Sequence, residues 1–299
     1  MAEIVPDYYK KFRCIADRCR HSCCIGWEID IDGRALSYYN SLDTEMGKRI
    51  RQNIDGEIPH FVLTEDERCP FLNKNGLCDI ITECGEDALC DICRLHPRFS
   101  NFFDSFTETG LGLCCEEAVR IVLGEKEKFT VDMPDFQSIT DEEREFLAVR
   151  GEIFAVLQDR EKSIHERFCN LSKIYGFEFD FSLSELCAVY LSLERLDESW
   201  TEVLKSTADY EFDMTVFENE DYALIFEQLS CYFIFRHLAD ALWYGDYCER
   251  VRFTLMSCYL IGAIIEKTKS TYDEIREIVR MYSSEVEYSE ENMEKLLAI

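Results

Sequence analysis

Apolar residues recur with the period of an α-helix through the second half of the chain. A capping box, TDEE at residues 140–143, precedes an apolar stripe that runs from Phe146 to Leu157. The same pattern predicts further helices, which are from about residue 162 to Gly176, from Ser182 or Ser184 to Leu196, over 220–243, over 246–268, from the TYDE capping box at 271–274, and over 289–299. We therefore expect an all-α helical bundle over residues 131–299.

The first 130 residues carry shorter periodic stretches, which turn-forming residues interrupt. Short helices are predicted over 30–42, 43–54, 85–97 and 115–124. Turns are predicted at Cys69-Pro70, at NGLC (75–78) and at ETGLGLCC (108–115). The fold class is thus mainly α, with an irregular, cysteine-rich metal-binding module of short helices (residues 1–130) followed by a helical domain (131–299).

The cysteines divide the chain at the same place. Eleven of the 16 cysteines precede residue 116. The five others stand apart among apolar residues, where a free cysteine packs as a small hydrophobic side chain, and they are Cys169, Cys187, Cys231, Cys248 and Cys258. Only the early cysteines are therefore candidates for metal or thiol chemistry.

The chain start shows no apolar run behind basic residues, so no signal peptide is expected. The longest apolar run, Leu255–Ile265, is about half the length of a membrane span. We expect a cytoplasmic protein without a membrane partner. A reducing compartment disfavours disulfides and favours metal binding by the early cysteines.

The spacing of the early cysteines indicates a metal site without choosing the metal. Thiolates bind both zinc and iron–sulfur clusters. Cys90 and Cys93 form a CxxC pair, whereas the other spacings are less regular than those of zinc knuckles. Neighbouring side chains diverge, so Cys23 and Cys24 fit two centres, or one centre and one non-ligand, better than a single zinc ion. The number of centres stays open.

Charge narrows the class of partner. The chain has 32 Lys and Arg against 60 Asp and Glu, a net charge of −28. Residues 1–130 hold 16 basic and 24 acidic residues, and the remainder holds 16 and 36. This balance argues against nucleic-acid binding, and it favours a protein partner that presents lysines.

Four segments resemble a known family, the flagellin lysine-N-methylases of the FliB type. They are CIADRCRHSCCIGWEIDID (14–32), CPFLNKNGLCDI (69–80), GEDALCDICRLHPRF (85–99) and GLGLCCEEAVRIVL (110–123). The YkgJ-type cysteine-cluster group, which chelates zinc or iron, shares the dense cysteine start. The family pattern falls on Cys14, Cys19, Cys23, Cys24, Cys69, Cys78, Cys93 and Cys115.

The chain departs from the family pattern at two kinds of position. Glu116 stands where the family usually has proline after the last cysteine. Cys84, Cys90 and Cys114 are additional to the pattern, and we place them behind the other eight as ligands.

The resemblance implies a [4Fe–4S] cluster and methyl transfer from S-adenosylmethionine to lysine side chains of flagellin. The CxxxCxxC motif of radical enzymes is absent from the early cysteines, and no glycine-rich nucleotide fold is evident. Arg98 is the candidate for binding the cofactor carboxylate, because guanidinium groups bind carboxylates bidentately. No catalytic residue is assigned.

Two further side chains near these motifs are expected to be structural. His96, beside Pro97, is expected to have a structural role, and Trp27 is expected to pack over the cluster and exclude water. Two alternatives from other classes remain: a non-catalytic zinc- or iron-binding module, and an iron–sulfur electron-transfer protein.

Overall fold

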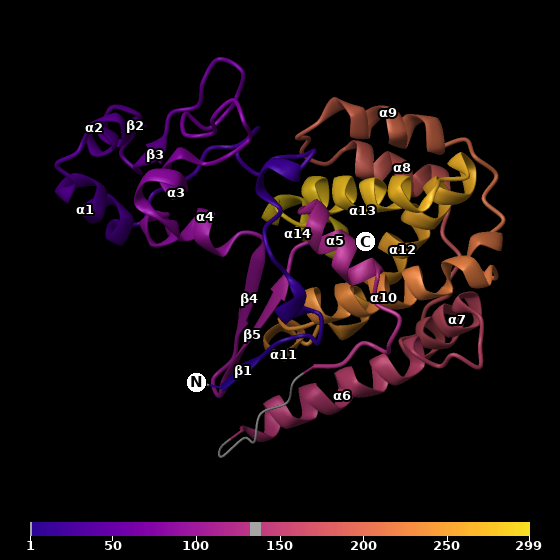
Figure 1. Ribbon diagram of the computed structural model, residues 1–299. Coiled ribbons are helices and arrows are strands. Elements are labelled where there is room, and N and C mark those ends of the chain that lie inside the picture. Colours follow the sequence, from indigo (N-terminus) through magenta and orange to yellow (C-terminus); the bar gives the residue numbers. More distant parts are fainter. Residues whose placement is uncertain (1, 132–138) are drawn as a thin grey trace. The chain divides into compact units, whose positions relative to one another are not determined.

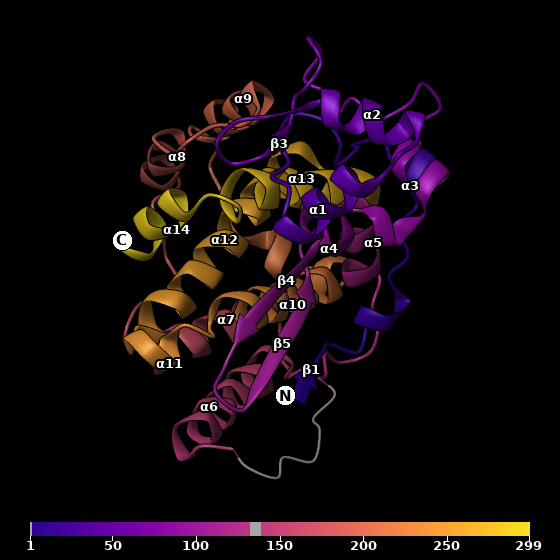
Figure 2. The same cartoon turned by 90° about the vertical axis from the view of Figure 1, so that its left-hand side faces the viewer.

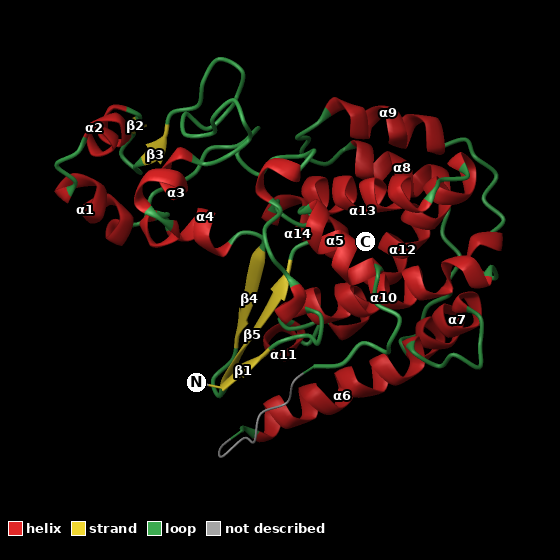
Figure 3. Ribbon diagram, in the orientation of Figure 1, coloured by secondary structure: helices red, strands yellow, loops and turns green. Residues whose placement is uncertain are grey.

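The structure is a computed structural model that describes residues 2–131 and 139–299. The described residues form 14 α-helices and few strands, which confirms the mainly α fold class (Figures 1 and 3). The helices are α1 Gly33–Ser41, α2 Glu45–Gln52, α3 Asp79–Cys84, α4 Asp91–Leu95, α5 Glu116–Leu123, α6 Asp141–Leu157, α7 Ile164–Ile174, α8 Leu183–Leu191, α9 Glu198–Thr207, α10 Glu220–His237, α11 Ala241–Tyr244, α12 Tyr247–Thr268, α13 Tyr272–Val286 and α14 Glu290–Leu297. The strands are β1 Ala2–Ile4, β2 Ile54–Asp55, β3 His60–Phe61, β4 Arg98–Phe102 and β5 Phe106–Leu111.

The chain divides into two compact units. The helical unit comprises residues 1–12, 99–114 and 118–299, and the cysteine unit comprises residues 13–98 and 115–117. The predicted domain boundary at residue 130 stays a prediction. None of the helices in the described ranges is both long enough and apolar enough to cross a membrane.

The helical unit is built around α12, which packs against α7, α8, α9, α10, α13 and α14 (Figures 1 and 2). The capping boxes at Thr140 and Thr271 are both formed, which confirms the predicted starts of α6 and α13. Cys187, Cys231 and Cys258 are fully buried in this unit, as expected for core thiols. Cys169 and Cys248 are half-buried.

The helix predicted from Ser182 or Ser184 to Leu196 is shorter in the structure, where α8 ends at Leu191. The carboxylate of Glu285 accepts hydrogen bonds from the backbone N–H groups of Leu196 (3.1 Å) and Asp197 (2.8 Å). These donors therefore have a side-chain partner outside the helix, and the chain turns before α9. A similar break at residues 238–240 separates α10 from α11 within the predicted helix 220–243.

A three-stranded sheet in the helical unit has the order β1-β5-β4, with β1 parallel to β5. The turn predicted over residues 108–115 was therefore wrong for its first part, since β5 continues to Leu111. Gly110 is required by packing, because any side chain there would collide with the ring of Phe99. Gly110 thus reflects a close approach within the sheet.

A buried ion pair joins this sheet to α6. Arg150 donates hydrogen bonds to both carboxylate oxygens of Glu108 on β5, one of them 2.7 Å long. Both side chains are almost completely buried, at 2% and 0% exposure. The guanidinium also lies 5.0 Å from the ring centre of Phe146 and 5.4 Å from that of Phe235. Strand β5 is thereby fixed to the helices of the same unit.

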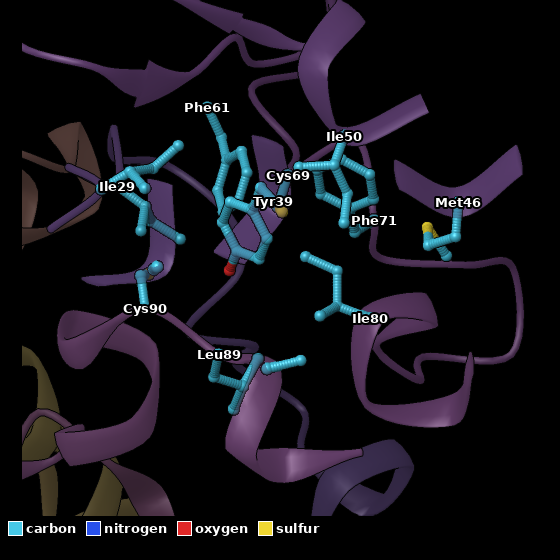
Figure 4. Packing of buried hydrophobic residues seen from close by; sticks show 13 residues of the cluster. Ile29, Tyr39, Met46, Ile50, Phe61, Cys69, Phe71, Ile80, Leu89 and Cys90 are labelled. Carbon is cyan, nitrogen blue, oxygen red and sulfur yellow. The ribbon is translucent and has the colours of Figure 1, made fainter. Parts of the chain in front are cut away.

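The cysteine unit has its own small hydrophobic core, in which the rings of Tyr39, Phe61 and Phe71 pack together (Figure 4). Asp32 caps α1 by accepting the N–H of Ala35 at 2.9 Å, and its other oxygen accepts the N–H of Asp91 at 2.7 Å. This second bond fixes the start of α4. The helix predicted over 85–97 is consequently split into a 3-10 turn, Glu86–Ala88, and α4.

Candidate functional site

All eight predicted ligands lie in the cysteine unit. They are Cys14, Cys19, Cys23, Cys24, Cys69, Cys78, Cys93 and Cys115. Cys84 and Cys90 belong to the same unit, whereas Cys114 falls in the helical unit. Within the described residues, no three His, Cys, Asp or Glu side chains stand in the geometry of a bound metal ion. The structure thus gathers the predicted thiols without setting them at coordination distances.

Five cysteines form what we call the inner thiol group: Cys24, Cys69, Cys78, Cys90 and Cys93. Cys69 and Cys90 belong to the hydrophobic core of the cysteine unit (Figure 4). Cys24, Cys78 and Cys93 pack against this core, as does Cys84, which we leave out of the group because no thiol is among the causes of its pKa shift. The backbone N–H of Cys69 donates to the carbonyl of Cys24 at 2.8 Å. A β-bridge between Leu72 and Cys78 closes the loop that follows Cys69. Backbone pairing therefore holds Cys24 beside Cys69 and fixes Cys78 at the end of the loop that follows Cys69.

Backbone N–H groups point at two of the inner sulfur atoms in the same way. The thiols of Cys69 and Cys78 each accept hydrogen bonds from the N–H groups two and three residues further along the chain. Burial raises the pKa of Cys69 to about 12, and these hydrogen bonds oppose that shift. Donors of this kind stabilise a thiolate and tune metal–sulfur centres.

Cys90 and Cys93 are a hydrogen-bonded pair. The hydrogen bond from the Cys93 thiol lowers the pKa of Cys90, and the same bond raises the pKa of Cys93. Cys90, which ranks behind the eight predicted ligands, lies in the inner thiol group beside Cys93. Its CxxC spacing from Cys93 was the signal that pointed to it.

Four cysteines form what we call the outer thiol group: Cys14, Cys19, Cys23 and Cys115. Burial raises the pKa of Cys19, and together with the neighbouring charges of Glu116, Cys115 and Cys14 it brings this pKa to about 12. The hydrogen bond to Cys24 raises the pKa of Cys23, and the neighbouring thiols of Cys14 and Cys115 raise it as well. These influences place the four thiols in one neighbourhood.

Glu116, at the start of α5, anchors the loop that carries the outer thiols. Its carboxylate accepts hydrogen bonds from the backbone N–H groups of Arg20 (3.0 Å) and His21 (3.1 Å). The two N–H groups lie between Cys19 and Cys23, while Glu116 directly follows Cys115. The residue at which the chain departs from the family pattern thus connects the two ends of the outer thiol group.

The two thiol groups meet at Cys23 and Cys24. The hydrogen bond from the Cys23 thiol lowers the pKa of Cys24 to about 7, although burial acts in the opposite direction. Hydrogen bonding by Ser22 and the charge of Arg68 also lower it. Cys24 is therefore the thiol in this region that is closest to ionising at neutral pH.

Trp27, His96 and Arg98 form a row beside the thiols. The indole Nε1 of Trp27 donates to the backbone carbonyl of Cys23 at 2.8 Å, and its ring centre lies 6.3 Å from that of His96. Burial, and to a lesser extent the charge of Arg98, lowers the pKa of His96 to about 4. Arg98 is half-buried at the start of β4. Trp27 and His96 therefore connect Cys23 to Arg98, the candidate residue for binding the cofactor carboxylate.

The donor set fits a thiolate-bound metal centre. The sulfur atoms are soft ligands suited to zinc or iron–sulfur clusters. Burial raises the pKa of several of these thiols, including Cys19 and Cys69, so they carry protons at neutral pH. A bound metal displaces such protons and compensates the thiolate charges, which couples metal binding to folding.

Fold and thiols together define a mainly helical protein with a cysteine-rich unit. The family described as the FliB lysine N-methylase C-terminal domain matches residues 133–299, more than half of the chain. The chain belongs to this family.

Curated relatives carry names that agree with the family. The Lysine-N-methylase of Salmonella typhimurium (strain LT2) is 26% identical over 135 residues, which cover 40% of this chain and 32% of the relative. The Flagellar biosynthetic protein FliU of Salmonella muenchen is 27% identical over 143 residues, covering 42% and 83%. The chain thus spans about a third of the length of the first relative. No solved structure matches the chain.

Proposed function

We propose that the protein transfers methyl groups from S-adenosylmethionine to lysine side chains of flagellin, and that an iron–sulfur cluster on the cysteine unit is required. The observation that carries this proposal is the family match over residues 133–299. The names of the Salmonella relatives support lysine as the acceptor and a flagellar protein as the substrate.

The proposed reaction moves one methyl group. A carbon–nitrogen bond forms to the lysine amine, while the carbon–sulfur bond of the sulfonium breaks and leaves its electron pair on sulfur. The amine reacts in its neutral form, so the acceptor lysine, with an ordinary pKa of about 10.4, also loses a proton. The products are methyl-lysine and S-adenosylhomocysteine.

Thiolates of the cysteine unit, Cys93 among them, would hold the cluster, and an iron without a thiolate ligand would bind the amino and carboxylate groups of S-adenosylmethionine. Arg98 binds the same carboxylate, because its guanidinium is permanently charged and half-buried. Trp27 fixes the backbone at Cys23 through its indole N–H, while its own ring and the Cys23 side chain are exposed to solvent. His96 is held neutral by its lowered pKa, so it adds no second positive charge beside Arg98.

The acidic balance of the chain supports a substrate rich in exposed lysines. The net charge of −28 attracts a basic surface over a distance of about 10 Å at moderate ionic strength. Methyl transfer at low substrate concentration should therefore weaken as salt is added.

The proposal is tested by calorimetry with S-adenosylmethionine and by mass spectrometry of flagellin after incubation with the anaerobically reconstituted protein. We expect cofactor binding and single methyl additions on lysines, both lost in Cys93→Ser. Cys84→Ser is the matched control. Burial and the charge of Glu83 raise the pKa of Cys84, and no other thiol is among the causes of this shift. Absence of cofactor binding by protein with a full cluster would refute the methylase proposal.

A second candidate function, a structural zinc module, is favoured by one observation. The paired N–H donors around Cys69 and Cys78 suit a zinc-bound thiolate as well as an iron-bound one. A colourless protein that contains stoichiometric zinc and no labile sulfide would establish this alternative. Brown protein with iron and sulfide would exclude it.

A further inference from the structure

We infer that the cysteine unit holds two separate metal centres, one on the inner thiol group and one on the outer thiol group. This inference rests on the proposed metal binding and adds the number of centres and the assignment of each cysteine. It does not depend on methyl transfer, so its test is independent of the enzymatic activity.

The inner thiol group belongs to the core of the cysteine unit. Cys69 and Cys90 are buried members of that core, and the other three inner thiols pack against it. The stretch from Cys24 to Gly26 is paired with the stretch from Glu67 to Cys69, through bonds of 2.8 Å at Cys24 and 2.9 Å at Gly26. Cys24 is therefore fixed to the inner group by its backbone.

The outer thiol group lies outside that core. Its four members are absent from the cluster of buried residues described for the cysteine unit, and Cys14 and Cys23 are exposed. The loop from Cys19 to Cys23 is attached to Glu116 instead. His21 is hydrogen-bonded to Glu116, and Cys24, three residues later, is hydrogen-bonded to Cys69. The chain therefore changes from the outer group to the inner group over these three residues.

The electrostatic neighbours of each thiol follow the same division. Cys14 and Cys115 lie near Cys19, whereas Cys24 and Cys78 lie near Cys69. The contact between Cys23 and Cys24 is the place where the groups touch. The chain therefore presents two sets of at least four thiols, and each set suffices for a tetrahedral zinc or a four-cysteine cluster.

The experiment measures iron and acid-labile sulfide per chain in the full-length protein after anaerobic reconstitution with ferrous iron and sulfide. Single variants remove one ligand from each group, Cys69→Ser for the inner group and Cys115→Ser for the outer group. Two double variants distinguish the models: Cys69→Ser/Cys78→Ser lies within a group, and Cys69→Ser/Cys115→Ser spans both. Circular dichroism reports whether each variant retains its helices.

Two centres predict that each single variant loses about half of the iron, and that the within-group double loses no more. The cross-group double should lose nearly all of it. Cys114→Ser, next to Cys115 but hydrogen-bonded to Tyr288 in the helical unit, should keep the full content. Cys84→Ser should do the same.

The inference is overturned if either single variant, with its helical content intact, loses all of the iron, because one shared centre would then use both groups. It is also overturned if one group can be removed without any loss of iron. A wild-type protein that takes up no metal at all would contradict the underlying proposal of metal binding.

Discussion

The carboxylate of Glu116 accepts a hydrogen bond of 3.1 Å from the backbone N–H of His21, which lies 95 positions earlier in the chain. This bond places the residue after Cys115 at the loop between Cys19 and Cys23. The usual proline of the family pattern has no carboxylate with which to make this contact. In this chain, Glu116 therefore organises the outer thiol group.

Replacing Glu116 with alanine should loosen the outer thiol group. The variant loses two hydrogen bonds from backbone N–H groups to a charged acceptor, so we expect a loss of about 1 kcal/mol in the free energy of unfolding. Urea unfolding followed by circular dichroism measures this change. Iron retention during gel filtration should fall as well.

Glu45→Ala is the control for this variant, because Glu45 lies in the same unit and pairs with Lys48 on the surface. It should leave both the stability and the iron content nearly unchanged. Equal effects of the two substitutions would show that Glu116 has no special role in the cysteine unit.

Arg98→Ala should weaken binding of S-adenosylmethionine about tenfold, since one charged contact to the carboxylate is lost. The iron content should stay unchanged, because Arg98 contributes no thiolate. Calorimetry measures the affinity. Arg94→Ala is the matched control in the same segment, where Arg94 is exposed and paired with Asp91. An affinity that falls equally in both variants would remove Arg98 from the cofactor site.

His96 predicts a pH dependence of stability. Its pKa is about 4 in the folded chain against an ordinary value of 6.5, mainly because it is buried. The depressed pKa means that the unfolded chain takes up the proton first. Stability from neutral His96 is thus fully present above pH 6.5 and is lost as the pH falls toward 4, by at most about 3 kcal/mol.

The measurement is urea unfolding at several pH values between 4 and 7 for the wild type and for His96→Gln. Carboxylates contribute to the pH dependence of both proteins, so the difference between the two curves isolates His96. The difference should narrow as the pH falls through this window. Parallel curves would mean that His96 titrates normally in the folded protein.

Arg150→Met should destabilise the helical unit by about 3 to 5 kcal/mol, because it leaves the Glu108 carboxylate buried without its partner. The double variant Glu108→Gln/Arg150→Met should recover much of this loss. Thermal unfolding measures both. Iron content should be unaffected, since the pair lies outside the cysteine unit. A double variant no more stable than Arg150→Met would show that the pair itself does not hold β5 to α6.

Local signals in the sequence predicted most helices of the second half, although α8 and α10 end earlier than expected and α9 was not predicted. Thr140 and Thr271 form their capping boxes because each motif is complete within four residues. Strand β5 was not predicted, because Gly110 indicated a turn. The structure shows that Gly110 instead makes room for the ring of Phe99, eleven residues earlier, and that the partner strand β1 lies about 100 residues away in the chain. Pairings over such distances leave no periodic pattern in the strand itself.

The sequence predicted which cysteines lie together in the candidate site, but not how they are divided within it. Cysteine density and family resemblance selected eight thiols, and all eight lie in one compact unit. Their division depends on long-range contacts, namely Glu116 with His21 and Cys24 with Cys69, which spacing along the chain does not encode. Cys90, which the family pattern leaves out, lies beside Cys93 as their CxxC spacing indicates, and its rank as a ligand stays a prediction.

The central claim is that thiol-bound iron in the cysteine unit is required for lysine methylation. The most direct measurement follows methyl transfer to flagellin by one preparation in three states: reconstituted with iron and sulfide, stripped by an iron chelator under anaerobic conditions, and reconstituted again. We predict methylation in the first and third states and none in the second, with the helical content retained throughout. Undiminished methylation by the stripped protein would contradict the claim.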